Sequence, residues 1–198
     1  MNEHLHKERS EKHKTAFESK VAEASREKGL LIVNTGSGKG KSTAAFGMGV
    51  RALAHGMKLG VVQFIKGAMR SSEREFFSSQ PNCCFKTIGD GYTWMTQDCV
   101  ADASTAMAAW DCAASMIKSG DYQMVILDEL TWVLKYKYLD LDEVLAILAN
   151  RRSDLHVVVT GRHAPAELIE IADLVSEIKN VKHPFKEQGV KAQKGVEF

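Results

Sequence analysis

The sequence predicts an α/β fold in which helices cover both faces of a mostly parallel sheet. Two observations support this prediction. The expected strands are continuous apolar runs rather than alternating ones, and strands of this kind are buried on both faces. Helical segments separate these runs along most of the chain, an order that is typical of parallel pairing. Since ligands bind beyond the carboxyl ends of the strands in such sheets, we expect the functional site at that edge.

The expected elements alternate along the chain from residue 30 onward. Strands are predicted at 30–35, 59–65, 84–89, 122–130, 155–162 and 174–178. Helices are predicted at 42–55, 102–118, 141–152 and 165–172. Asp102 is the expected N-cap of the second of these helices. Gly47 and Gly49 should each cost the first helix up to about 1 kcal/mol, which we expect close packing against the sheet to offset.

The first 28 residues differ from the rest because they are polar and carry charges of both signs. Phe17, Val21 and Ala24 recur at helical spacing, which predicts a helix near residues 15–28. Two interpretations stay open: a mobile arm or solvated helix, and an arm that docks over a site. We therefore divide the chain into an N-terminal arm, residues 1–28, and one domain, residues 29–198.

Composition is that of an ordinary globular protein, with 198 residues, 44% hydrophobic and 26% charged. A formal net charge of +1 gives no support to a large nucleic-acid footprint. No apolar run approaches the roughly 18 residues of a membrane span, and the N-terminal residues lack the apolar region of a secretory signal. The four cysteines form no C-x-x-C pair, so we expect the reduced thiols of a cytoplasmic protein.

The stretch TGSGKGKST is typical of a loop that binds phosphates. Its three glycines allow several backbone N–H groups to converge on one point, and a helix N-terminus follows. Lys41 adds a full positive charge, and the Ser42 hydroxyl is a ligand suited to Mg²⁺. The position after a strand and before a helix predicts a triphosphate site. The predicted ATP-binding residues of this loop are Thr35, Gly36, Ser37, Gly38, Lys39, Gly40, Lys41, Ser42 and Thr43.

Two positions of this loop depart from the usual G-x-x-x-x-G-K-[ST] pattern. Thr35 stands where the first glycine is expected, and a second lysine, Lys39, lies inside the loop. Threonine is acceptable at this position if its backbone is extended, because only a positive φ would require glycine.

A pair of carboxylates, Asp128 and Glu129, follows a strand that reads as central in the sheet. We expect them beside the phosphates and Mg²⁺, so the predicted metal-binding residues are Ser42, Asp128 and Glu129. Because successive side chains of a strand point to opposite faces, we expect one of the two carboxylates to contact the metal directly.

Aromatic and basic residues near other strand ends are candidates for the remaining contacts. Tyr92 and Trp94 are two apart, so in an extended segment they share a face, either packing the core or forming a platform for a large flat ligand. Arg162 and Lys66 each follow a strand, and Arg51 lies within the first helix. Each of these three is either a solvated charge or a contact to phosphate, nucleotide or substrate.

The chain resembles the P-loop cob(I)alamin adenosyltransferases, the corrinoid adenosyltransferase family. The resemblance rests on the loop and helix NTGSGKGKSTAAFGMGVRALAHG, then VVQFIKG, GYTWMTQD, VILDEL, VVVTGRHAP, ADLVSEIKNVKHPF and the tail GVKAQKGVEF. It implies a P-loop NTPase-like, RecA-like fold. It also implies transfer of the 5′-deoxyadenosyl group of ATP to a Co(I) corrinoid, with release of triphosphate. A homodimer, an arm that closes over the corrinoid, and an electron-donating, flavoprotein-like reductase as partner are further implications.

The same resemblance assigns roles to the candidate residues. It implies ATP bound in a reversed direction, with Mg²⁺ near Ser42 and Glu129. Because the whole triphosphate would leave, positive charge at Lys39 beside the catalytic Lys41 suits the loop. Arg51 and Arg162 are predicted to bind ATP.

The aromatic candidates, Tyr92 and Trp94, occupy the positions of the family residues that displace the lower axial base of the cobalt. A four-coordinate Co(II) is then easier to reduce to Co(I). The resemblance therefore makes both residues corrinoid-binding and catalytic.

Two other functions use the same loop and stay open as alternatives. A nucleoside or small-molecule kinase would need mobile arginines over the γ-phosphate, for which the segment after residue 160 offers Arg162 alone. A RecA-like nucleic-acid protein would need a basic strip, which the net charge does not support. The sequence leaves the preferred corrinoid and the reductase undetermined.

Overall fold

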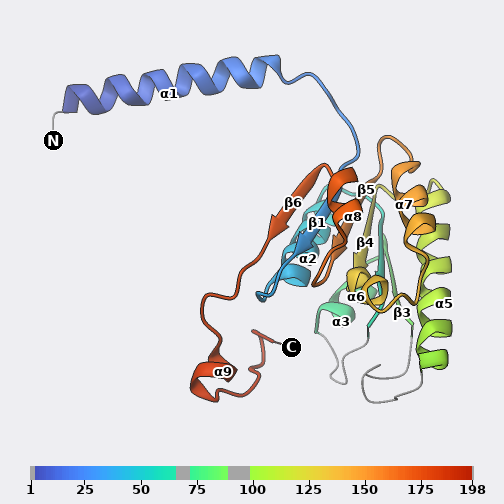
Figure 1. Cartoon of the computed structure of the whole chain (residues 1–198). Coiled ribbons are helices and arrows are strands. Elements are labelled where there is room, and N and C mark those ends of the chain that lie inside the picture. Colours follow the sequence, from blue (N-terminus) through green and yellow to red (C-terminus); the bar gives the residue numbers. More distant parts are fainter. Residues whose placement is uncertain (1–2, 66–71, 89–98, 198) are drawn as a thin grey trace.

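A computed structural model describes residues 3–65, 72–88 and 99–197 and shows one parallel sheet (Figure 1). Its strands are β1 Leu31–Thr35, β2 Leu59–Gln63, β3 Cys83–Thr87, β4 Met124–Asp128, β5 His156–Thr160 and β6 Leu174–Glu177. They lie in the order β3-β2-β4-β5-β1-β6, and every neighbouring pair is parallel. The predicted fold class is confirmed, and β5 lies between the strand of the phosphate loop and the strand of the carboxylates.

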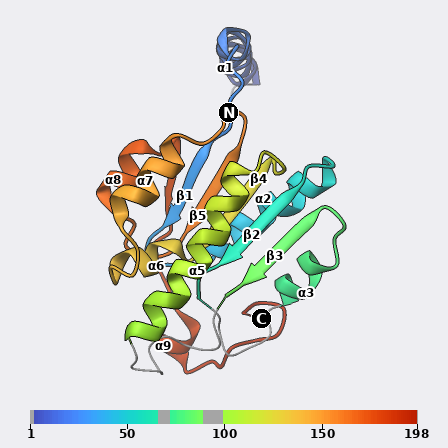
Figure 2. The same cartoon turned by 90° about the vertical axis from the view of Figure 1, so that its right-hand side faces the viewer.

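Helices cover both faces of this sheet (Figure 2). The helices that cover it are α2 Lys41–Ala54, α3 Ser72–Ser78, α5 Cys99–Lys118, α6 Leu130–Lys135, α7 Leu141–Ala149 and α8 Ala166–Ile171, and the two other described helices, α1 Glu3–Glu23 and α9 Pro184–Gln188, lie outside these layers. The core under α2 and α3 is separate from the core under α5, α6, α7 and α8. Both faces of the strands are therefore buried.

The central strand β4 shows why apolar runs in the sequence are continuous. Val125 and Leu127 belong to the core under α5, whereas Ile126 between them belongs to the core under α2. All three side chains are fully buried. Alternation along the strand distributes its residues between two apolar cores, so no position of the strand is left for a polar side chain until Asp128.

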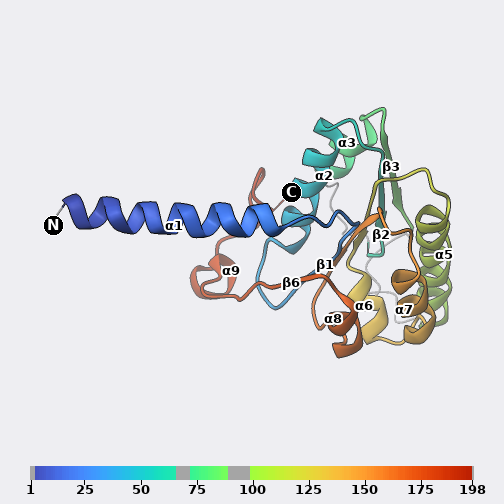
Figure 3. The ribbon, with the colours of Figure 1, turned by 90° about the horizontal axis from the view of Figure 1, so that it is seen from above.

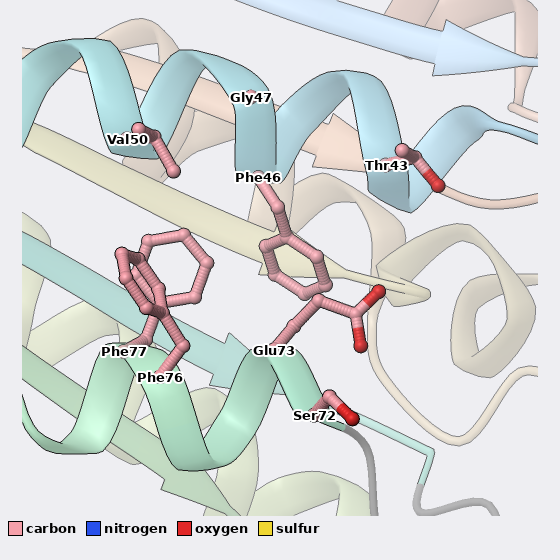
Figure 4. Close-up of a pocket in the computed structure, with 8 residues that line it drawn as sticks. All are labelled: Thr43, Phe46, Gly47, Val50, Ser72, Glu73, Phe76 and Phe77. Atoms are coloured by element: carbon pink, nitrogen blue, oxygen red, sulfur yellow. The ribbon is translucent and has the colours of Figure 1, made fainter. Parts of the chain in front are cut away.

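Aromatic packing fixes the helix of the phosphate loop against its neighbour α3. The rings of Phe46 on α2 and Phe77 on α3 lie 5.4 Å apart between centroids. They line a pocket of about 380 Å³ together with Thr43 near the start of α2 (Figure 4). The start of α2, and with it the phosphate loop, is therefore held by packing between the two helices.

The two glycines inside α2 behave differently. A Cβ at Gly49 would lie 3.1 Å from side-chain atoms of Ile126 and Leu59, so the predicted close packing against the sheet is confirmed there. At Gly47, none of the described atoms lies within 4 Å of the corresponding point, and the residue lines the pocket instead. The expectation of close packing was therefore wrong for Gly47, because this position faces away from the sheet.

Several helix boundaries differ from the prediction. The N-terminal helix spans Glu3–Glu23 rather than residues 15–28, because its glutamates and lysines are good helix formers from the start of the segment. Helix α5 begins at Cys99, so Asp102 lies in its first turn and the prediction of an N-cap was wrong. The short helix α6 was not predicted, and its first residue, Leu130, had been included at the end of a predicted strand. Its six residues are too few to show helical periodicity.

Helix α1 extends away from the sheet (Figures 1 and 3). Its apolar residues Phe17 and Val21 are 69% and 54% exposed. Across the described ranges, no helix is long and apolar enough to cross a membrane. The thiols of Cys83, Cys84 and Cys112 are free.

Candidate active site

The carboxyl ends of β1, β4 and β5 meet at one edge of the sheet, and the predicted residues of the phosphate loop and the carboxylate pair lie there. Lys41 follows β1 across the phosphate loop, and Asp128 is the last residue of β4. The two charges interact, since Asp128 is among the groups that raise the pKa of Lys41. The structure thus confirms that Lys41 and Asp128 lie at the same edge.

The phosphate loop is shaped partly by the segment that follows β6. Gly36 has φ 101°, and a Cβ there would lie 2.4 Å from the carbonyl oxygen of Ile178. Gly38 donates its N–H to that same oxygen at 2.7 Å. Glycine at both positions is explained by this close approach of backbone, and one N–H group of the loop is already engaged.

Thr35 ends β1 in extended conformation, so glycine is not required there, as expected. Its hydroxyl accepts a hydrogen bond from the N–H of Ala164 at 3.3 Å. This contact links the loop to the segment after β5.

The first turn of α2 presents the anion-binding end of a 14-residue helix. Lys41 is 6% exposed, and its Nζ donates to the carbonyl oxygen of Gly38 at 2.6 Å. Ser42 is half-buried beside it, whereas Ser37 and Thr43 are exposed. Gly40 precedes the helix with φ 104°. The predicted loop residues therefore surround one helix N-terminus.

The carboxylate of Asp128 is buried and held on both sides. Its Oδ1 accepts from the Thr160 hydroxyl at 2.7 Å, and its Oδ2 accepts from Gln63 Nε2 at 3.0 Å. The residue is 2% exposed. These contacts fix the orientation of the carboxylate and leave lone pairs on both oxygens for another ligand.

Glu129 leaves the strand in the left-handed conformation, with φ 61° and ψ 25°. Its N–H donates to the Thr160 hydroxyl at 3.0 Å. Because β4 ends at Asp128, the alternation of a strand does not extend to Glu129. Both carboxylates consequently lie near enough to Lys41 to raise its pKa. The expectation that the two side chains point to opposite faces of a strand does not apply to this pair.

The charged groups of the site are poorly neutralised by one another. Burial lowers the pKa of Lys41, and the neighbouring Arg162 and Lys39 lower it further, against the opposing effect of Glu129 and Asp128. Burial also raises the pKa of Glu129, as does Asp128, while Lys41 and Arg162 act in the opposite direction. A polyphosphate would supply negative charge beside Lys41, and a divalent cation would supply positive charge beside Glu129.

Lys39 lies in the phosphate loop and Arg162 beside it, whereas Arg51 lies further along α2. Lys39 forms an ion pair with Glu197 of the C-terminal segment. Arg162 is exposed, and its carbonyl oxygen accepts from the buried Thr131 hydroxyl at 2.7 Å. Arg51 lies in the last turn of α2, ten residues from Lys41, which is about 15 Å along the helix.

Three candidates, Tyr92, Trp94 and Lys66, lie outside the described residues. Conversely, no sequence pattern pointed to Thr160 or Glu197, which contact the site from distant segments. Within the described part of the chain, no group of three or more histidine, cysteine, aspartate or glutamate residues could hold a metal by itself. Mg²⁺ does not need such a group, because it takes one or two carboxylates and otherwise phosphate and water oxygens.

Comparisons with known proteins agree on one family. Residues 27–198 match the family described as ATP:corrinoid adenosyltransferase BtuR/CobO/CobP. A corrinoid adenosyltransferase of Pseudomonas aeruginosa is 52% identical over 194 residues, which are 98% of this chain and 95% of that protein. Another, from Salmonella typhimurium, is 41% identical over 198 residues, which cover both chains completely.

A solved structure supports the fold alone. The flagellar accessory protein FlaH of Methanocaldococcus jannaschii is 11% identical and has a TM-score of 0.50, over 76% of this chain and 71% of that chain. The sheet order and this likeness identify a RecA-like α/β fold.

Proposed function

This chain belongs to the ATP:corrinoid adenosyltransferase family, and we propose that it performs the family's reaction at the edge formed by the phosphate loop, Asp128 and Glu129. The protein is an enzyme that transfers the adenosyl group of ATP to a corrinoid. The observation that carries the proposed location is the buried, incompletely neutralised Lys41 between a helix N-terminus and two carboxylates. Such a site favours a polyphosphate anion.

The phosphate loop has the task of stabilising the leaving group. A Co(I) centre supplies an electron pair to the 5′-carbon of ATP, a cobalt–carbon bond forms, and the bond from that carbon to the α-phosphate oxygen breaks. Triphosphate leaves with the electron pair of the broken bond. Lys41, the N–H groups of the first turn of α2 and Arg162 would hold that developing charge. Lys39 would help to stabilise that charge if it left its ion pair with Glu197 and paired with a phosphate instead.

The residues present fit a magnesium ion. The Ser42 hydroxyl and the oxygens of Asp128 and Glu129 are hard ligands of the kind that Mg²⁺ prefers. Burial, and next to it the charge of Asp128, raises the pKa of Glu129, and a divalent cation beside Glu129 would favour its charged form. When bound, Mg²⁺ would neutralise part of the charge on the triphosphate.

The corrinoid contacts and the partners rest on the family resemblance. Tyr92 and Trp94 would face the lower side of the corrin and keep the axial base away. The exposed Phe17 and Val21 on α1 support an arm, residues 1–28, that covers a site, in a homodimer. An electron-donating reductase and a cytoplasmic location complete this proposal.

Product analysis tests the proposed function. The protein is incubated with ATP, cobalamin and a strong chemical reductant, and the phosphate products are separated. Triphosphate formed in equal amount to adenosylcobalamin is expected. ADP in place of triphosphate would favour a kinase, and ADP formed only with DNA or RNA would favour a nucleic-acid motor. Either result would reject the proposal.

A further inference from the structure

Thr160 lies at the centre of the site, although no sequence motif identified it as a site residue. It is the last residue of β5, the strand that separates the phosphate-loop strand β1 from the carboxylate strand β4. The residue is fully buried. The next residue, Gly161, donates its N–H to the carbonyl oxygen of Asn34 on β1 at 3.2 Å. The end of β5 therefore contacts both halves of the site.

A single hydroxyl connects the two carboxylate residues. Thr160 Oγ1 donates to Asp128 Oδ1 at 2.7 Å and accepts from the N–H of Glu129 at 3.0 Å. A hydroxyl has one hydrogen to donate and two lone pairs, so both contacts are satisfied at once. Valine has nearly the same shape as threonine and could make neither contact.

These two contacts have different structural consequences. With Gln63 on the other oxygen, the first contact fixes the plane of the Asp128 carboxylate. The second holds the backbone of Glu129 in a left-handed conformation that a residue with a Cβ rarely adopts. That conformation lets the Glu129 carboxylate approach Lys41 and Gly161 rather than continue the alternation of β4.

We propose that Thr160 is a positioning residue that sets Asp128 and Glu129 in the arrangement needed to bind magnesium with ATP. This inference rests on the proposed function, because it assumes that the carboxylates face a metal–triphosphate complex. Its own claim is that the hydroxyl of Thr160, acting through both neighbours, determines how much Mg²⁺ strengthens ATP binding. Partners that orient metal ligands commonly change metal affinity about 10- to 100-fold when removed.

The experiment compares ATP affinity with and without metal in variants of the full chain. Titration calorimetry measures ATP binding in Mg²⁺ and in EDTA, and the ratio of the two affinities is the readout. The variants are Thr160→Val, which removes the hydroxyl, and Thr160→Ser, which keeps it. Val158→Ala is the matched control, because it disturbs a fully buried side chain of the same strand that faces the α2 core. If Thr160→Val does not fold, Thr160→Cys replaces it, since a thiol is a weaker donor.

The expected result is specific to the hydroxyl. Thr160→Val should reduce the magnesium-dependent gain in ATP affinity by about tenfold or more. Thr160→Ser and Val158→Ala should retain the gain, although Val158→Ala lowers the melting temperature. A folded Thr160→Val with the wild-type gain, or a Thr160→Ser that loses as much as Thr160→Val, would overturn the inference alone. A wild-type protein without any magnesium-dependent gain would overturn the proposed metal site, and this inference with it.

Discussion

The two ends of β1 carry charged clusters of opposite character. At the amino end, Asp173 accepts a hydrogen bond from the N–H of Leu31 at 2.9 Å and another from Arg151 Nη2 at 3.0 Å, and it pairs with Lys28. The hydrogen bond from Lys28, followed by that from Leu31, holds the pKa of Asp173 below its ordinary value. Arg151 also donates to the carbonyl oxygens of Leu148 and Gly29. Every charge here has a partner within the chain.

At the carboxyl end of β1 the charges are less well matched. The pKa of Lys41 is lowered and that of Glu129 is raised, mainly because burial disfavours their charged forms. The difference between the ends indicates different roles. The cluster around Asp173 stabilises the fold, whereas the cluster around Lys41 costs stability and supplies charge to a ligand.

The largest effect is expected when Lys41 is removed. Lys41→Ala should reduce adenosyl transfer by about 100-fold or more, because it removes a preorganised charge at a developing anion. Thermal stability should be nearly unchanged, because the removed cation was desolvated and poorly paired. Rates of adenosylcobalamin formation and melting curves measure the two effects. Lys118→Ala, at the exposed end of α5, is the control. A folded Lys41→Ala protein within tenfold of the wild-type rate would contradict the assignment.

The opposite outcome is expected at the amino end. Asp173→Asn should lower the free energy of unfolding by about 1–2 kcal/mol, because charged hydrogen bonds are weakened at a side chain that is still 19% exposed. Adenosyl transfer should continue at the wild-type rate below the melting temperature. Urea denaturation and activity assays on one preparation test both points. An inactive but stable variant would mean that the two ends are not independent.

The same residue predicts a pH dependence with a defined sign. The folded pKa of Asp173 lies below 3.8, so its contribution to stability is fully present above that pH. The contribution is lost as the pH falls through the lowered folded value. The stability difference between wild type and Asp173→Asn should therefore shrink below pH 3.8. Denaturation at pH 3 and pH 6 measures it, and a difference that grows on acidification would reverse the assignment.

A moderate effect is expected from the second lysine of the loop. Lys39→Ala should slow adenosyl transfer several-fold, less than Lys41→Ala, because the Lys39 side chain is half-exposed and its charge is screened by solvent. Glu197→Gln should instead strengthen ATP binding slightly, since it frees Lys39 from its ion pair. Calorimetry and transfer rates measure these effects. An unchanged rate in Lys39→Ala would show that the second lysine serves the C-terminal segment alone.

The smallest effect tests whether the carboxylate pair costs stability. Glu129→Gln should raise the melting temperature of the ligand-free protein by about 2 °C at neutral pH, because it removes a charge that burial disfavours. Because the folded pKa of Glu129 is raised, its charge lowers the stability of the fold at a pH above that folded value. This loss of stability disappears as the pH falls below 4.5, where the carboxyl is protonated in both the folded and the unfolded chain. Melting curves at pH 4 and pH 8 measure the change. A lower melting temperature at pH 8 would show that Lys41 and Arg162 fully neutralise the carboxylate.

The sequence predicted the elements with strong local signals. The apolar strands around Val33 and Ile126, the glycine loop and the helix after it all carry patterns within ten residues. Parallel pairing then places Lys41 and Asp128 at one edge, as the structure confirms. These features were predictable because burial on two faces and phosphate-loop geometry both constrain contiguous residues.

The remaining features depend on strand order and long-range contacts. Thr160 reaches Asp128 and Glu129 because β5 lies between β1 and β4, which no local pattern reveals. The left-handed conformation of Glu129 depends on that same neighbour. Glu197 meets Lys39 across almost the whole chain. These residues look like ordinary polar positions until the sheet has been assembled.

The contact between Lys39 and Glu197 has a consequence for the order of events during synthesis. The phosphate loop is among the first parts of the sheet to be made, but Glu197 is translated 158 residues after Lys39. At about 5–20 residues per second, Glu197 is made roughly 8–30 s after Lys39. During that interval Lys39 lacks the carboxylate with which it later forms an ion pair. The ion pair of Lys39 therefore forms at the end of synthesis, after all six strands of the sheet have been translated.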